Sequence, residues 1–150
     1  MRWPQYLALI VLCPVLAASA ADGRVVKVLQ HYVDKEGRQS LSPSLYERDA
    51  YQARLRHNPN DISAVEFDVQ WKVSGPDKAN LKVRVEVRGG KVAAKPLVLE
   101  GPVKADRWGA TWSGLKMTSD EYRGLGEVVA WRVTLWRGDV MLAEQTSFLW

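Results

Sequence analysis

The stretch VEFDVQWKV, residues 65–73, decides the fold because apolar and polar residues alternate through its whole length. In an extended chain the apolar side chains share one face and the polar side chains share the other. The stretch LKVRVEVR, residues 81–88, repeats this pattern. Such alternation is typical of strands that cover a core on one side and meet water on the other. Because the turn residues GPD lie between them at 75–77, we expect the two stretches to be adjacent antiparallel strands.

Five further stretches are expected to be strands, which makes seven in all. They are residues 25–33, 92–99, 108–112, 128–136 and 140–149. Gly89-Gly90 is expected to form the tight hairpin turn into the strand at 92–99. Pro96 cannot donate a backbone hydrogen bond, so this strand is expected at the edge of a sheet.

One helix, over residues 44–57, is expected to be inserted between the first two strands. Ser44 and Glu47 have the spacing of a capping box at its start, and Pro59 ends it. Its apolar residues spread around the circumference, so we expect it to cover an end of the sheets. A second helical turn with capping-box spacing is expected at residues 118–122.

The alternation also predicts which side chains form the core, since every second residue of a half-buried strand points inward. The expected core contains Val65, Phe67, Val69, Trp71, Leu81, Val83, Val85, Trp131, Val133 and Leu135. Trp108 and Trp112 are expected to share one apolar face of their strand.

Seven short strands with turn signals between them resemble an immunoglobulin-like or fibronectin type III-like β-sandwich. The resemblance implies an antiparallel two-sheet fold in which Trp71 acts as the core tryptophan. The chain is also similar to small secreted bacterial proteins that share a stretch like LSPSLYERDAYQ, residues 41–52, and end like LAEQTSFLW, residues 142–150. This second resemblance implies no known activity.

The first twenty residues have the pattern of a cleavable export signal. An apolar run, YLALIVLCPVL at residues 6–16, is followed by small residues up to Ala20, where the A-x-A pattern predicts cleavage. Cys13, the one cysteine of the chain, lies in this run and follows Leu12, so lipidation is not expected. We therefore expect a single cysteine-free domain, residues 21–150, exported to the bacterial periplasm or the extracellular space.

The composition argues against several classes of function. The 150-residue chain has a formal net charge of +4, with the signs interspersed, so a nucleic-acid partner is not expected. The two histidines, His31 and His57, have no nearby ligand pattern, so no metal or other cofactor is expected. No nucleophile elbow or phosphate loop is present either, and we expect no enzymatic activity.

A binding or structural role remains the main hypothesis, with two alternatives left open. The aromatic final residue, Trp150, and the alternating strands are also compatible with a small outer-membrane-associated β-barrel protein. The third alternative is an enzyme without a recognisable site.

A hypothetical binding surface is expected near the helix and the final hairpin. Aromatic and arginine side chains are the usual anchors of interfaces. The candidates are Tyr46, Arg48, Tyr51 and Arg54 on the helix and Trp136 and Arg137 on the hairpin. The expected partner is an envelope protein or a glycan. The structural alternative is that Tyr46 and Tyr51 pack at the edge of the sandwich and Trp136 packs on a neighbouring strand.

Overall fold

A computed structural model describes residues 23–74, 79–91, 95–103 and 111–150. This part of the chain forms seven strands, two α-helices and one short 3-10 turn. In chain order they are β1 (Gly23–Asp34), α1 (Leu45–His57), the 3-10 turn (Pro59–Asp61), β2 (Ile62–Val73), β3 (Leu81–Gly89), β4 (Leu97–Pro102), β5 (Thr111–Thr118), α2 (Ser119–Leu125), β6 (Val128–Arg137) and β7 (Val140–Thr146). The expected mainly β fold with seven strands is confirmed.

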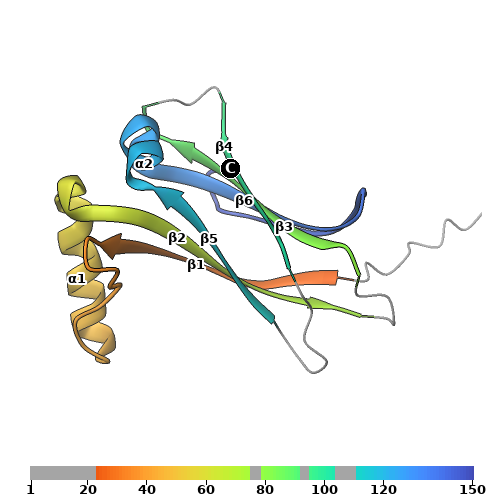
Figure 1. The fold of residues 1–150 in the computed structure, drawn as a ribbon, viewed down its shortest axis with the longest axis horizontal. Coiled ribbons are helices and arrows are strands. Elements are labelled where there is room, and N and C mark those ends of the chain that lie inside the picture. Colours follow the sequence, from red (N-terminus) through yellow and green to blue (C-terminus); the bar gives the residue numbers. More distant parts are fainter. Residues whose placement is uncertain (1–22, 75–78, 92–94, 104–110) are drawn as a thin grey trace, which may run out of the picture.

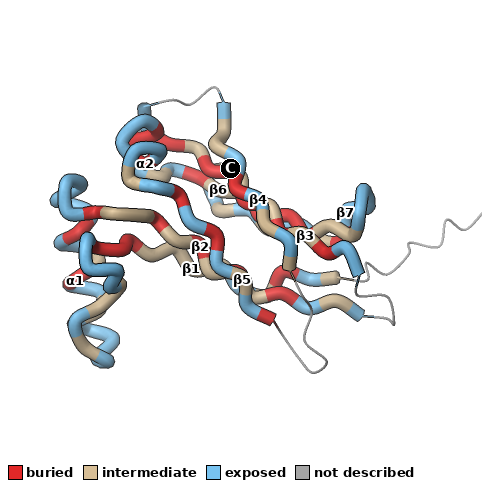
Figure 2. The backbone as a smooth tube through the Cα atoms, in the orientation of Figure 1, coloured by how far each residue is buried: buried red, intermediate tan, exposed pale blue. Residues whose placement is uncertain are grey.

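The strands form two antiparallel sheets that lie one above the other (Figure 1). The order is β1-β2-β5 in one sheet and β4-β3-β6-β7 in the other. The sheets approach each other along both sides, where β1 lies near β7 and β5 lies near β4. Buried and less buried segments alternate along the strands (Figure 2). The apolar faces of the two sheets therefore make a sandwich-like core.

The predicted core is confirmed for every residue except Trp131, which is half-buried and packs against the core. Phe67 is 0 % exposed and Trp71 is 1 % exposed. The indole N–H of Trp71 donates a hydrogen bond of 2.9 Å to Oγ of Ser113, so its polar atom is satisfied. The apolar residues of the two alternating stretches thus form the core between the sheets.

The expected pairing of β2 with β3 is wrong, because the two strands lie in different sheets. β2 pairs with β1 and β5, whereas β3 pairs with β4 and β6. Alternation gives each strand one apolar face but does not say which strand is its neighbour. Here the two apolar faces cover each other across the sandwich.

The hairpin of β3 and β4 differs in detail from the expectation. β4 is an edge strand, as expected, but it begins at Leu97, after Pro96. Neither Gly89 nor Gly90 has a positive φ, so the expected tight turn at this pair is wrong. Gly89 is instead needed for space, since a Cβ there would lie 2.2 Å from the carbonyl oxygen of Leu125. Residues 92–94 of the connection lie outside the described residues.

β5 also differs from the expectation, since it begins at Thr111 and continues to Thr118. Leu115 and Met117 face the core, so Trp112 faces outward and is 47 % exposed. The expected apolar-face position of Trp112 is therefore wrong. The burial of Leu115 and Met117 therefore decides which face of β5 points toward the core. Trp108 lies outside the described residues.

Two helices are present in the described chain, whereas the expected fold had one helix and a helical turn. α1 lies at one end of the sheet that contains β1 and β2 (Figure 1). Ser44 is its N-cap, but the side chain of Ser44 makes no capping hydrogen bond, so the expected capping box there is wrong. At α2 the expected capping box is confirmed, since Thr118 and Glu121 bond to each other's backbone N–H groups.

Among the described residues, neither helix has the length and apolar character needed to cross a membrane.

Candidate functional site: the cleft between β1 and α1

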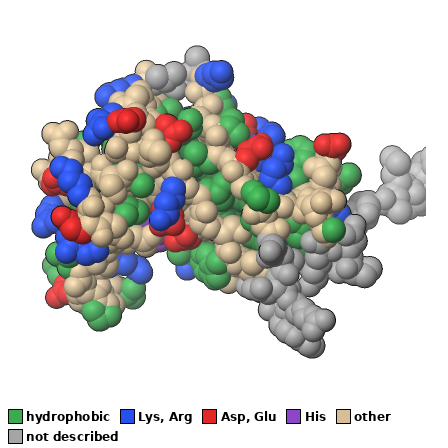
Figure 3. Space-filling view, viewed as in Figure 1, with side chains coloured by type: hydrophobic (Ala, Val, Ile, Leu, Met, Phe, Trp, Pro, Cys, Tyr) green, Lys and Arg blue, Asp and Glu red, His purple; other side chains and the backbone are tan. Residues whose placement is uncertain are grey.

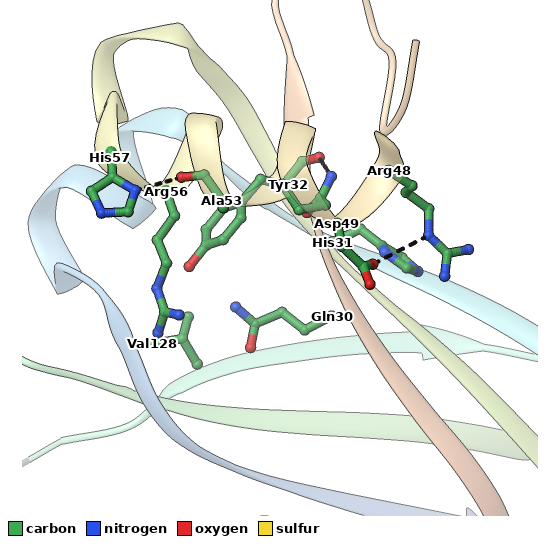
Figure 4. A pocket seen from close by; sticks show the side chains of 10 residues that line it. Gln30, His31, Tyr32, Arg48, Asp49, Ala53, Arg56, His57 and Val128 are labelled. Atoms are coloured by element: carbon green, nitrogen blue, oxygen red, sulfur yellow. Dashed lines mark hydrogen bonds and ion pairs between the residues drawn. The ribbon is translucent and has the colours of Figure 1, made fainter. Parts of the chain in front are cut away.

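A cavity of about 520 Å³ lies between helix α1 and strand β1 (Figure 4). We call it the β1–α1 cleft. Its lining residues are Gln30, His31, Tyr32, Arg48, Asp49, Gln52, Ala53, Arg56, His57 and Val128. The first three come from β1, Val128 comes from the start of β6, and the others come from one side of α1. The cleft is therefore built where an outer strand, a helix and the second sheet meet.

The floor of the cleft is the outer edge of β1. Gln52 of α1 covers one end of this edge, because its Oε1 accepts from the backbone N–H of Tyr32 at 2.7 Å. Its Nε2 donates to the carbonyl oxygen of Tyr32 at 2.8 Å. The side-chain amide of Gln52 thus occupies the place of a neighbouring strand. These two hydrogen bonds show that the backbone polar groups of Tyr32 point away from β2.

Gln30 continues the same edge without such a cover. Residues along an antiparallel strand alternate between bonding one neighbour and the other. The register between β1 and β2 is regular from Lys27 to Val33. The N–H and C=O of Gln30 therefore point to the same outer edge as those of Tyr32, and Gln30 lines the cleft. The backbone donor and acceptor of Gln30 are therefore not used in the pairing of β1 with β2.

Helix α1 is fixed against β1 by a buried carboxylate. Asp34 is 3 % exposed and accepts hydrogen bonds from the hydroxyl of Tyr51 and, at 2.8 Å, from Nε of Arg38. Burial by itself would raise the pKa of the Asp34 carboxyl, but these hydrogen bonds outweigh it and hold the pKa well below its usual range. The hydrogen bond to Asp34 also raises the pKa of Tyr51. The wall of the cleft is thus anchored to its floor.

The side chains around the cleft are mostly polar and carry more basic than acidic groups. Gln30 and Arg56 point toward one another across the cleft (Figure 4). Arg56 is bound to Glu127, with its Nε 2.6 Å from Oε1. Nε of Arg48 lies 3.9 Å from Oδ1 of the exposed Asp49, a long ion pair at the surface that contributes little. On the face of the molecule that Figure 3 shows, Lys and Arg side chains are interspersed with Asp and Glu side chains.

The ring of Tyr32 closes the inner end of the cleft. It packs edge-on against Tyr122 of α2, with the ring centroids 5.8 Å apart. Burial and the neighbouring Tyr122 raise the pKa of the Tyr32 phenol, so it stays neutral and can donate or accept hydrogen bonds.

The predicted helix residues divide between two environments. Arg48 lines the cleft. Tyr51 is buried and holds α1 in place, and Arg54 lies over its ring at 4.6 Å. Tyr46 is 84 % exposed, and it lines a pocket together with Leu41, Tyr51 and Arg54.

The predicted hairpin residues lie at the other end of the molecule. The turn between β6 and β7 is far from α1 in Figure 1, so the structure does not bring the helix and the hairpin into one surface. Trp136 is half-buried, its indole N–H donates to Oγ1 of Thr134 at 2.8 Å, and Arg84 lies over its ring at 5.5 Å. Arg137 is half-buried at the end of β6.

Sequence reasoning missed Gln30 and Gln52. The signal for Gln30 is its position between Val28 and Tyr32, since all three share the inward phase of β1. A glutamine at an inward-facing position predicts either a buried amide whose hydrogen bonds are all made within the protein or an opening between the sheets. No local pattern indicates that the side chain of Gln52 caps a strand edge.

Among the described residues, no group of three or more His, Cys, Asp or Glu side chains could hold a metal ion. The chain matches no protein-family model, and neither the curated proteins nor the solved structures contain a match to it.

Proposed function

We propose that this chain is an exported β-sandwich binding module with fibronectin type III-like topology. Constant-type immunoglobulin domains place the fourth strand in the sheet of strands one, two and five. Here β4 pairs with β3, in the sheet of β6 and β7. This strand order supports the fibronectin type III-like branch of the sandwich architecture. The pattern of residues 1–20 supports export.

The module binds an extended segment of a partner polypeptide at the outer edge of β1. The observation that carries this function is the open backbone of Gln30 on the floor of a cleft of about 520 Å³. An extended peptide adds to such an edge through main-chain hydrogen bonds, and pockets beside the edge select its side chains. Because the amide of Gln52 already bonds the backbone of Tyr32, the added segment runs along β1 from Gln30 in the direction away from Asp34.

The cleft favours a segment that carries a carboxylate. Arg48 is half-buried on the wall, and its only ion pair in the described chain is the weak contact with Asp49. A guanidinium can hold a carboxylate through two parallel hydrogen bonds. Since the chain is exported in this proposal, the partner is an envelope protein with an exposed extended segment.

The test begins with a random peptide library displayed on phage and selected on the protein without residues 1–20. Selected peptides are then titrated calorimetrically against variants. Gln30→Pro removes the backbone donor at the open edge, where proline is compatible with the strand, so affinity should fall by at least about tenfold. Gln30→Ala keeps the N–H and should retain most of the affinity.

Lys116→Pro is the matched control, because it makes the same change on the other outer strand of that sheet, β5. It should bind the selected peptides as the wild type does. No enriched peptides, or equal affinities for the wild type and Gln30→Pro, would contradict strand addition at this edge.

A further inference from the structure

The outward face of the β1-β2-β5 sheet carries a second group of side chains that the cleft does not use. The register places Trp112 opposite Gln70, Gly114 opposite Asp68 and Lys116 opposite Glu66. Inward neighbours such as Phe67 and Leu115 are buried, so these six positions face away from the core. Trp112 is 47 % exposed there.

Gly114 makes a hollow beside Trp112. Its φ is not positive, so the backbone does not require glycine. A Cβ at this position would lie 3.0 Å from Oε1 of Glu66 and 3.2 Å from Oδ1 of Asp68. The missing side chain therefore leaves room for both carboxylates to reach over β5 at Gly114, two residues along the same face from Trp112.

The two carboxylates are held in place by neighbours. His31 lies 3.6 Å from Oδ2 of Asp68, which leaves Oδ1 on the side of Gly114. Gln39 donates to Oε2 of Glu66 at 2.7 Å, and Lys116 lies 3.5 Å from Oε1. The result is a fixed pair of hydrogen-bond acceptors on the same sheet face as the exposed Trp112.

We propose that this face binds a neutral glycan, with one pyranose ring stacked on Trp112 and hydroxyl groups donating to Asp68. A pyranose has an apolar C–H face and a rim of hydroxyl groups, which match an indole and a fixed carboxylate. Sugars that carry a carboxylate would meet the negative charges of Glu66 and Asp68. The proposed ligand contacts, Trp112 and Asp68, do not line the β1–α1 cleft, and the two sites meet only at His31, which lines the cleft and lies beside Asp68. The proposal does not depend on the function proposed for the cleft.

The test is native affinity electrophoresis in gels that contain laminarin, xylan, hydroxyethylcellulose or galactomannan, with alginate as the anionic probe. The wild type should be retarded by at least one neutral polysaccharide. Trp112→Ala should weaken that binding at least tenfold, while Trp112→Phe should keep most of it. Asp68→Asn should weaken binding without loss of the fold, as checked by circular dichroism.

Trp136→Ala is the matched control, because it removes a tryptophan from the other sheet and should leave retardation unchanged. The proposal is overturned if none of the four neutral polysaccharides retards the wild type or if alginate alone does. Equal retardation of the wild type and Trp112→Ala overturns it as well.

Discussion

The two phenylalanines of the chain offer a matched test of the core. Phe67 on β2 is 0 % exposed, whereas Phe148 is 99 % exposed. Truncating a buried phenylalanine to alanine costs about 3–5 kcal/mol, because burial is lost and a cavity remains. The same change on an exposed side chain without partners stays within about 0.5 kcal/mol. Phe67→Ala should therefore lower the free energy of unfolding by several times more than Phe148→Ala.

Urea unfolding followed by tryptophan fluorescence measures this difference. With a denaturant slope of about 2 kcal/mol per M, a loss of about 3–5 kcal/mol lowers the midpoint by about 1.5–2.5 M. Phe148→Ala should unfold at the wild-type midpoint, and the slope should stay the same in both variants. A loss below about 1 kcal/mol for Phe67→Ala would refute the assignment of the β2 face to the core.

Three further predictions concern processing, acid stability and the helix caps. N-terminal sequencing of the exported protein should begin at Ala21, and recovery of intact Met1 in the membrane fraction would contradict cleavage. Because the folded-state pKa of Asp34 lies below its unfolded value of about 3.9, the unfolded state binds more protons. The stability from this carboxyl is thus present above about pH 4 and lost as the pH falls further. Asp34→Asn should flatten that part of the pH profile of urea unfolding, and an unchanged profile would count against it. Thr118→Ala should cost about 1 kcal/mol in the same assay, whereas Ser44→Ala should cost almost nothing because Ser44 makes no side-chain cap bond. Equal losses would contradict the observed difference between the caps.

The strands and most of the core follow from the sequence because alternation is a local signal with a direct physical cause. The expected edge position of β4 is also observed, but Pro96 does not cause it, because the strand begins after Pro96, at Leu97. The pairing of the strands does not follow from the sequence. Two successive strands with one apolar face each can pair within one sheet, or they can lie in facing sheets with their apolar faces in contact. β2 and β3 lie in facing sheets.

The two capping boxes show where spacing stops being sufficient. Both starts have the same three-residue interval, yet only Thr118 and Glu121 bond reciprocally. At α1 the backbone N–H of Ser44 donates to Oγ of Ser42 at 3.2 Å, so it does not bond to Glu47. The path of the chain before the helix decides which partner is reached.

The candidate site was predicted only in part. The composition of the helix predicts Arg48, which lines the cleft, but it also predicts Tyr51, which binds Asp34 inside the molecule. The open edge at Gln30 depends on β1 being an outer strand, which is a property of the assembled sheets. Similarly, the exposure of Trp112 depends on the phase of β5, which Leu115 and Met117 decide further along the chain.

Strand addition at β1 is tested most directly by the hydrogen exchange of one backbone amide. Amide exchange of Gln30 is measured by NMR in the free protein and in the presence of a saturating selected peptide, with the amide of Lys116 on β5 as the internal control. If a partner segment pairs with the edge, the Gln30 amide should become protected by at least about tenfold, while the Lys116 amide should not change. Equal exchange of the Gln30 amide in the free and bound states would contradict binding by strand addition.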